Sequence, residues 1–199
     1  MSKNALFRTL LRRLRDRGLH PRCVCFDGWY SGLDNLKLLR SFGWRWLTRL
    51  KSNRSVRLER GPPVAVRDAP IAPSGTVVWL PGYGLVKVFR IVATDGDTEH
   101  WASGDLGLSE LDRLRYGEQS WAIESYHRGL KQHCGAERCQ VRRARAQRNH
   151  IGFAIRAFLR LESWCFGHGF TWFQAKAEVI RDAVRSYLAQ PKYTLARGA

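Results

Sequence analysis

The order of helical and strand-like patterns in the first 54 residues is the feature that most constrains the fold. Residues 4–17 carry leucines at helical spacing, with arginines mostly elsewhere, which predicts an amphipathic helix. The apolar run Cys23–Phe26 predicts a short buried strand, and the period of Leu33–Phe42 predicts a second helix. Trp44–Leu50 alternates like a strand. This order of elements predicts an α/β core with parallel pairing.

A β-rich insertion is expected next in residues 55–105, because Pro62, Pro63, Pro70 and Pro73 break any helix there. Thr76–Leu80 and Val86–Ala93 are β-like and flank a Pro-Gly-Tyr-Gly turn. A third strand near His100–Ser103 would complete a small antiparallel insertion. The sequence thus predicts a partial core over residues 1–54 and a β-rich insertion over residues 55–106.

The remaining residues, 107–199, are expected to form a helical part. A long helix is predicted from about Gln147 to Phe166, buried through Ile151, Ile155, Phe158 and Leu159. Thr171–Gln174 has the form of a capping box that opens the last helix. The predicted fold class is therefore α/β, with an antiparallel β insertion and a helical C-terminal part.

The charge of the chain points to a polyanionic partner. Lys and Arg number 34 against 17 Asp and Glu, for a formal net charge of +17 and a pI of about 10.6. DNA or RNA is the first candidate and an anionic membrane surface is the rival. No apolar run approaches the length of a membrane span, and the start is no secretion signal. We therefore expect a cytoplasmic protein with no membrane partner, and RNA is disfavoured because no aromatic-basic sheet signature is present.

The five cysteines do not suggest a disulfide framework, because their number is odd and a reducing cytosol fits better. Cys23 and Cys25 lie in an apolar run and are expected to be small core residues. A zinc site is an alternative that matches no common finger spacing. Its ligands would be His133, Cys134, Cys139 and His150.

One stretch combines an acid with cations at helical spacing. At about 100° per residue, Glu124, His127, Arg128 and Lys131 would share one helix face, with Lys131 about 10 Å along the axis from Glu124. An acid that can hold a metal beside cations that can hold phosphates suits phosphodiester chemistry. The alternative is an amphipathic helix that carries ordinary solvated charges.

A second acid, Asp27, follows the predicted strand Cys23–Phe26 directly. Carboxylates at the C-terminal ends of α/β strands are where such folds usually place function. The alternative is a turn-forming Asp before Gly28. Two acids from separate elements, Asp27 and Glu124, can converge on Mg²⁺, which prefers oxygen ligands.

Four separated segments resemble the catalytic half of bacterial insertion-sequence transposases of the DDE type. They are Phe26–Tyr30, Leu47–Arg54, Trp101–Leu106 and Trp121–Gln132. The resemblance covers nearly the whole chain, in order, and is closest to the insertion-sequence-four-like group, which has a β-rich insertion before its last acid. It implies an RNase H-like fold and DNA transposition by metal-dependent cleavage and strand transfer.

The resemblance also implies roles for single residues. Asp27 would be the second catalytic Asp and Glu124 the final Glu, both ligands of Mg²⁺ or Mn²⁺. Transposon ends and target DNA would be the partners. The residues expected along the DNA are Lys51, Asn53, Arg54, Tyr126, His127, Arg128, Lys131, Gln140, Arg142, Arg143 and Arg145. Trp29, Tyr30 and Trp79 could stack on an unpaired base, although core packing is the favoured interpretation for each.

Two departures from the family pattern change the expected activity. The family's Tyr and Arg before the Glu are replaced by Gly117 and Ser120, and Tyr116 is one residue out of register. The first Asp is missing, because the one acid before Asp27 is Asp16 on the first predicted helix. We therefore expect a truncated and inactive transposase whose opening strands are missing.

The alternative function is a non-catalytic basic remnant that binds DNA or a full-length transposase. In either case the chain is expected to associate with the nucleoid, as a homodimer or with a full-length transposase. Whether it is an enzyme depends on a third acid that the residues before Asp27 do not supply.

Overall fold

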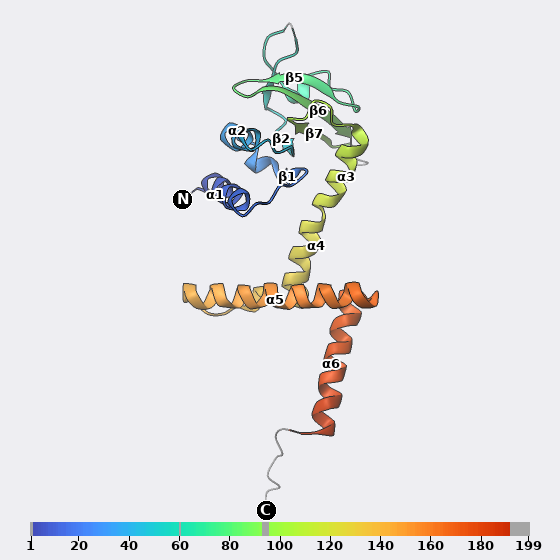
Figure 1. The fold of residues 1–199 in the computed structure, drawn as a ribbon. Coiled ribbons are helices and arrows are strands. Elements are labelled where there is room, and N and C mark those ends of the chain that lie inside the picture. Colours follow the sequence, from blue (N-terminus) through green and yellow to red (C-terminus); the bar gives the residue numbers. More distant parts are fainter. Residues whose placement is uncertain (1, 60, 93–95, 192–199) are drawn as a thin grey trace, which may run out of the picture. The chain divides into compact units, whose positions relative to one another are not determined.

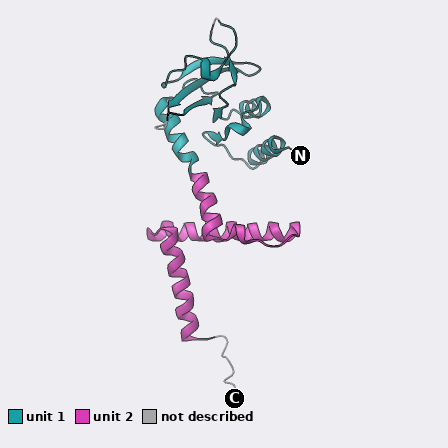
Figure 2. Ribbon diagram, turned by 180° about the vertical axis from the view of Figure 1, so that it is seen from behind, with its two compact units in different colours: residues 1–121 teal, residues 122–199 magenta. Residues whose placement is uncertain are grey.

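The computed structural model describes residues 2–59, 61–92 and 96–191 (Figure 1). Residues 1–121 and residues 122–199 form two compact units, called unit 1 and unit 2 below, and each is described by itself (Figure 2). Ala93, the last residue of one predicted strand, lies outside the described residues.

Unit 1 is built on a five-stranded sheet in the order β1-β2-β7-β6-β5. The strands are β1 (Val24–Phe26), β2 (Trp46–Leu50), β5 (Thr76–Leu80), β6 (Gly84–Val92) and β7 (Thr98–Ser103). β1 and β2 pair in parallel, which confirms the pairing predicted for the core. The other pairs are antiparallel, and β7 pairs with β2, so the strands predicted for the insertion extend the same sheet.

Two short strands, β3 (Ser55–Val56) and β4 (Val64–Ala65), form a separate antiparallel pair. A 3₁₀ turn, Val66–Asp68, follows β4. The turn between β5 and β6 contains Gly82 with φ 78°, a left-handed conformation that glycine adopts without steric cost. This agrees with the Pro-Gly-Tyr-Gly turn expected from the sequence.

The sheet is packed on both faces around β1 and β2, which explains the apolar residues of these strands. Helices α1 (Lys3–Asp16) and α2 (Leu33–Ser41) pack with one face, and α3 (Glu110–Ser120) packs with the other. Alternate residues of β2 serve the two faces: Trp46 packs with α1 and α2, whereas Leu47 packs with residues that precede and form α3. This alternation is the period-2 geometry of a strand.

β1 follows the same rule at the end of the sheet. Val24 and Phe26 pack toward α1 and α2, whereas Cys23 and Cys25 pack with Tyr116 of α3. The Cys25 Sγ lies 3.7 Å from the Tyr116 carbonyl oxygen. Both cysteines are half-buried free thiols, as expected for small core residues.

A buried amide joins α1, α2 and the turn that follows Asp27. Asn35 of α2 is fully buried. Its Oδ1 accepts a hydrogen bond from Arg8 Nη1 at 3.0 Å, and its Nδ2 donates to Asn4 Oδ1 at 2.7 Å and to the Tyr30 carbonyl at 2.8 Å. The periodicity that predicts α2 gives no sign of this network, because it groups residues only by polarity.

Unit 2 is helical, as predicted. It contains α4 (Ala122–Arg128), a π-helical turn (Gly129–His133), a 3₁₀ turn (Ala136–Arg138), α5 (Ala144–His168) and α6 (Trp172–Ala189). The capping box predicted for Thr171 and Gln174 is present at the start of α6. Among the described residues, none of the helices has the length and hydropathy needed to cross a bilayer.

The burial predicted for α5 is only partly correct. Phe158 is buried and Ile155 packs against the same cluster, but Ile151 is 48% and Leu159 59% exposed. The prediction is wrong for these two residues because the described contacts of α5 follow a narrow strip through Ala154 and Phe158. The apolar face that periodicity predicts for a helix can be wider than the face that neighbouring elements cover.

Replacing Asn35 with leucine is expected to lower the free energy of unfolding by about 1–3 kcal/mol. The change leaves the partly buried Tyr30 carbonyl without the hydrogen bond that Asn35 donates to it. Chemical denaturation followed by circular dichroism measures the difference. Asp34→Asn is the matched control, since the Asp34 side chain is 78% exposed and lies 3.8 Å from Arg8. If the two variants lose equal stability, the amide network does not hold α1 and α2 together.

Candidate functional site

Asp27 lies where β1 ends and caps the 3₁₀ turn Gly28–Tyr30. Its Oδ1 accepts a hydrogen bond from the Trp29 backbone N–H at 2.7 Å, and the side chain is exposed. Thr48 of β2 donates its hydroxyl to the Phe26 carbonyl at 2.8 Å, which holds the end of β1 against β2. Asp27 therefore does form the turn that the alternative interpretation expects. A carboxylate has a second oxygen, so this turn leaves acceptor capacity for a ligand.

Gly28 fixes the approach of this turn to β2. A Cβ at residue 28 would lie 2.8 Å from the Arg49 carbonyl oxygen, closer than a side chain can be accommodated. The sequence predicts a turn at Gly28 but does not predict this contact with Arg49. The Asp-Gly pair is the one feature of the sequence that points to a tight turn here.

A hollow of about 510 Å³ opens beside the turn that follows Asp27, and we call it the Asp27 hollow although Asp27 itself does not line it. The residues of its lining that matter here are Gly28, Trp29, Lys51, Asn53 and Arg54. The segments that follow the parallel strands β1 and β2 thus line one hollow, and three of the residues expected to contact DNA lie in it: Lys51, Asn53 and Arg54. Neighbouring parallel strands end at the same edge of a sheet, which explains why these two segments meet.

The Trp29 side chain lies close to two lysines at the Asp27 hollow. Its side chain is 61% exposed, and the Nζ atoms of Lys3 and Lys51 lie 5.6 and 5.7 Å from its ring. The favoured interpretation of Trp29 as a core residue is therefore wrong, whereas Tyr30 does pack, with its ring 4.9 Å from that of Phe7. Lys3 is a residue that the sequence analysis misses, because it is distant in sequence from Trp29.

The remaining stacking candidate, Trp79, is 42% exposed on β5, with the Arg57 guanidinium 6.0 Å from its ring. It also is not a core residue. In the Asp27 hollow, burial lowers the pKa of Arg54 from its ordinary value. A depressed arginine pKa still leaves the group charged at neutral pH.

In unit 2, Glu124 lies on the exposed surface of α4, together with His127 and Arg128. α4 ends at Arg128, and the next five residues form a π-helical turn. In that turn Gly129 packs so closely that a Cβ would lie 2.5 Å from the Phe158 ring. The α-helical spacing used to predict a common face therefore does not extend to Lys131.

Lys131 is already paired within unit 2. Its Nζ lies 2.9 Å from a carboxylate oxygen of Glu137, and both side chains are more than half exposed. The hydrogen bond to Glu137 raises the pKa of Lys131, and its charge and that of Glu124 add to the effect. The sequence analysis does not identify Glu137, because no spacing rule pairs it with Lys131 across the turn between them.

The other residues expected along DNA differ in exposure. Tyr126 is half-buried, with its ring 5.0 Å from Phe158 and edge-on to it. The remaining candidates are exposed before α5 and in its first turn: Gln140, Arg142, Arg143 and Arg145. In the part of the chain that the structure describes, these three arginines form no ion pair.

The structure contains carboxylates suited to the divalent metal that the resemblance implies, but its described residues do not assemble a full set of metal ligands. Asp27 and Glu124 are exposed carboxylates, and oxygen ligands suit Mg²⁺. They belong to different units. Within residues 2–59, 61–92 and 96–191, no three His, Cys, Asp or Glu side chains form a group that could hold a metal.

The same finding corrects the zinc alternative. Its four residues, His133, Cys134, Cys139 and His150, do not form a ligand group in the described chain. His150 Nε2 lies 3.0 Å from the Gly135 carbonyl, and the His133 ring meets that of Phe173 edge-on at 4.7 Å. These histidines serve local packing.

Comparison with known proteins identifies the family of the chain. The sequence profile of the family described as "Transposase DDE domain" matches residues 1–159, which include Asp27, the Asp27 hollow and Glu124. No curated protein matches the chain. Because the matched residues make up most of the chain, it belongs to the transposase DDE domain family.

Proposed function

We propose that this transposase-family chain binds transposon-end and target DNA and contributes Asp27 and Glu124 to metal-dependent phosphodiester cleavage and strand transfer. The observation that carries the proposal is the exposed Asp27 carboxylate at the end of a parallel strand pair, directly before a turn that lines a hollow with Lys51 and Arg54. Cations and an exposed aromatic ring beside a carboxylate suit a DNA strand presented to a reacting centre.

Asp27 and Glu124 would hold the divalent ion, Mg²⁺ or Mn²⁺. The bound ion would supply activation of water or a 3′-hydroxyl and neutralisation of the phosphate charge. Lys51 and Arg54 would bind phosphates near Asp27, and Trp29 would stack on an unpaired base. Near Glu124, Arg128 and Lys131 would hold phosphate, and the basic residues 142–148 would extend the DNA track.

The family pattern requires a third carboxylate, and we propose that strands not among the described residues supply it. Before Asp27 the one acid is Asp16, an exposed residue at the end of α1. β1 is the end strand of the sheet, and among the described strands it pairs only with β2. Leu6, Leu10 and Leu14 of α1 are also exposed. An open strand edge and an uncovered apolar stripe suit additional strands packed on this side.

A second candidate function is non-catalytic DNA binding, as a remnant or as a partner of a full-length transposase. It is favoured by the lack of any three-residue metal group within the described residues. It retains the excess of positive charge and requires no chemistry. Nicking activity separates the two functions, whereas DNA binding is common to both.

DNA binding by the chain is expected to depend steeply on salt and little on sequence. Each phosphate neutralised by Lys or Arg should add about −0.9 to the slope of log K against log salt concentration. Fluorescence anisotropy with two duplexes of unrelated sequence, each titrated at several salt concentrations, measures the slope. An affinity that stays constant from low to moderate salt would contradict electrostatic binding.

Glu137→Gln is expected to strengthen DNA binding about two- to tenfold, because it releases Lys131 from its ion pair. Lys131→Ala should weaken binding across sequences by a similar factor. Glu178→Gln is the matched control, since it removes the partner of a different cation, Arg181, at 2.6 Å. If both glutamine variants strengthen binding equally, the effect comes from net charge and not from Lys131.

The chain alone is expected not to nick DNA, because two carboxylates hold a divalent ion too weakly for two-metal phosphoryl transfer. The measurement uses supercoiled plasmid with Mg²⁺ or Mn²⁺, with Asp27→Asn and Glu124→Gln as controls. Glu124→Gln should bind DNA as well as the wild type or slightly better, since it removes a negative charge. Nicking that the wild type shows and Asp27→Asn loses would mean that another acid of this chain completes the site.

A further inference from the structure

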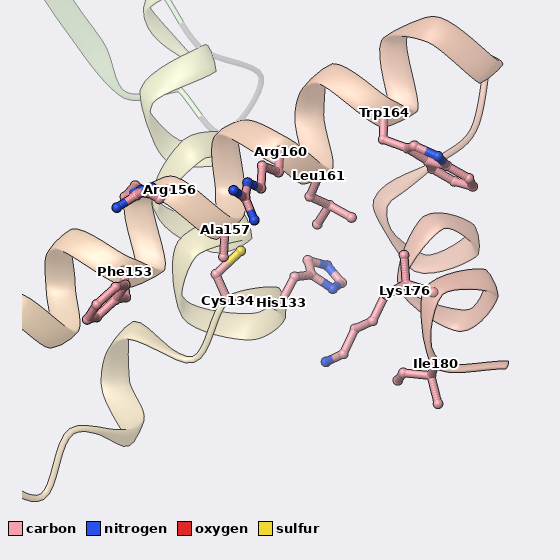
Figure 3. Close-up of a pocket in the computed structure, with 11 residues that line it drawn as sticks. His133, Cys134, Phe153, Arg156, Ala157, Arg160, Leu161, Trp164, Lys176 and Ile180 are labelled. Atoms are coloured by element: carbon pink, nitrogen blue, oxygen red, sulfur yellow. The ribbon is translucent and has the colours of Figure 1, made fainter. Parts of the chain in front are cut away.

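Unit 2 contains a cavity of about 660 Å³ between α5, α6 and the π-helical turn (Figure 3). We call it the α5–α6 groove. Its walls are largely apolar, with Ala157, Leu161 and Trp164 from α5 and Val179 and Ile180 from α6. A volume of this size is typical of a binding site. The family match ends at residue 159, so all of α6 lies outside the part of the chain that the family shares.

Three cations lie at this groove: Arg156 and Arg160 from α5, and the half-buried Lys176 from α6. Figure 3 shows Lys176 extending from α6 into the space between the helices. In the described chain none of the three forms an ion pair. The groove therefore offers positive charge that no acid in the described part of unit 2 pairs with.

The acids of α5 and α6 are engaged elsewhere. Glu178 pairs with Arg181 at 2.6 Å and Asp182 pairs with Arg185 at 3.8 Å. Glu162 of α5 accepts a hydrogen bond from the indole N–H of Trp172. These contacts leave the groove cations available to an anion from another molecule.

The polar groups on the floor of the groove carry no charge at neutral pH. Burial and the charge of Lys176 both lower the pKa of His133, so its ring stays neutral. Burial raises the pKa of the adjacent Cys134, which keeps it a thiol. The floor is thus uncharged, and the charge of the groove lies on its three cations.

The apolar surface continues along α6 beyond the cavity. Ile180, Val184 and Leu188 recur every four residues, and all three are more than half exposed. Phe173 at the start of α6 is 73% exposed. An apolar stripe along a helix is longer than a small molecule needs, and it matches the apolar face of a second helix.

We propose that the α5–α6 groove binds an acidic amphipathic helix of a partner protein. Apolar side chains of that helix would fill the cavity and cover Ile180 and Val184, and its carboxylates would pair with Arg160 and Lys176. A second copy of unit 2 fits less well, because it would bring a second set of the same unpaired cations. Duplex DNA supplies phosphates but no apolar face for Leu161 and Ile180.

The test uses the full chain and two synthetic helical peptides of about 18 residues, or five turns. The peptides share a leucine face, but one carries Glu and the other Lys at the polar positions. Fluorescence anisotropy of labelled peptide should show binding of the Glu peptide at least about tenfold tighter than binding of the Lys peptide. Added salt should narrow this difference.

Two variants locate the binding site. Lys176→Glu should weaken binding of the Glu peptide about tenfold, whereas Arg185→Glu, an equal charge change on α6 outside the groove, should weaken it far less. Ile180→Asp should also weaken binding, with circular dichroism to verify its helix content. If Ile180→Asp does not fold, the pair of surface charge variants still decides.

Three results would overturn the proposal. Equal binding of the two peptides would show that only exposed apolar surface is involved. Dimerisation of the chain in sedimentation experiments that Ile180→Asp abolishes would make a second copy the occupant. Displacement of the Glu peptide by duplex DNA, together with a larger loss of DNA affinity in Lys176→Glu than in Arg185→Glu, would assign the groove to DNA.

Discussion

The parallel pairing of β1 with β2 is the interaction on which the proposed site in unit 1 depends. It brings two strand ends to one edge of the sheet, so that Asp27 and Lys51 follow neighbouring strands. Thr48 holds the end of β1 through the Phe26 carbonyl, and Gly28 allows the turn to lie against Arg49. Both faces of this strand pair are covered, with α1 and α2 on one face and α3 on the other, which is the environment that parallel pairing favours.

The positive charge of the chain is distributed by its ion pairs and not by composition alone. Arg45, just before β2, lies 3.2 Å from Asp105, and Arg49 of β2 lies 2.7 Å from Glu99, so these cations are partly neutralised. Lys51 and Arg54, just beyond the same strand, have no such partner among the described residues. The surface that can attract phosphate is therefore smaller and more local than a net charge of +17 implies.

Unit 2 has a different physical character from unit 1. Its described core is a small cluster around Leu130, Ala154 and Phe158, and much of the apolar surface of α5 and α6 stays exposed. Helices gain most of their stability from packing of an apolar face, so such a surface is completed by association. This makes unit 2 the part of the chain that we expect to respond most to a partner, whether DNA along residues 142–148 or a helix in the α5–α6 groove.

The sequence by itself determined the elements and their class. Period-2 and period-3.6 patterns located β1, β2, α1 and α2, and the helix-strand order gave the parallel pair, because these follow from local backbone geometry. The sequence also predicted the capping box of α6, because its two residues, Thr171 and Gln174, are only three positions apart. The family was recognised from four short segments, because each keeps its chemistry-bearing residues together in the sequence.

Only the tertiary structure decided which side chains are exposed, paired or confined. Trp29 stands in solvent between Lys3 and Lys51, and Glu137 engages Lys131 across a turn. Sequence periodicity does not predict such contacts, because it describes one element at a time and the contacts join residues from different elements. Within the π-helical turn after Arg128, Gly129 packs closely against Phe158, a contact between elements far apart in the chain.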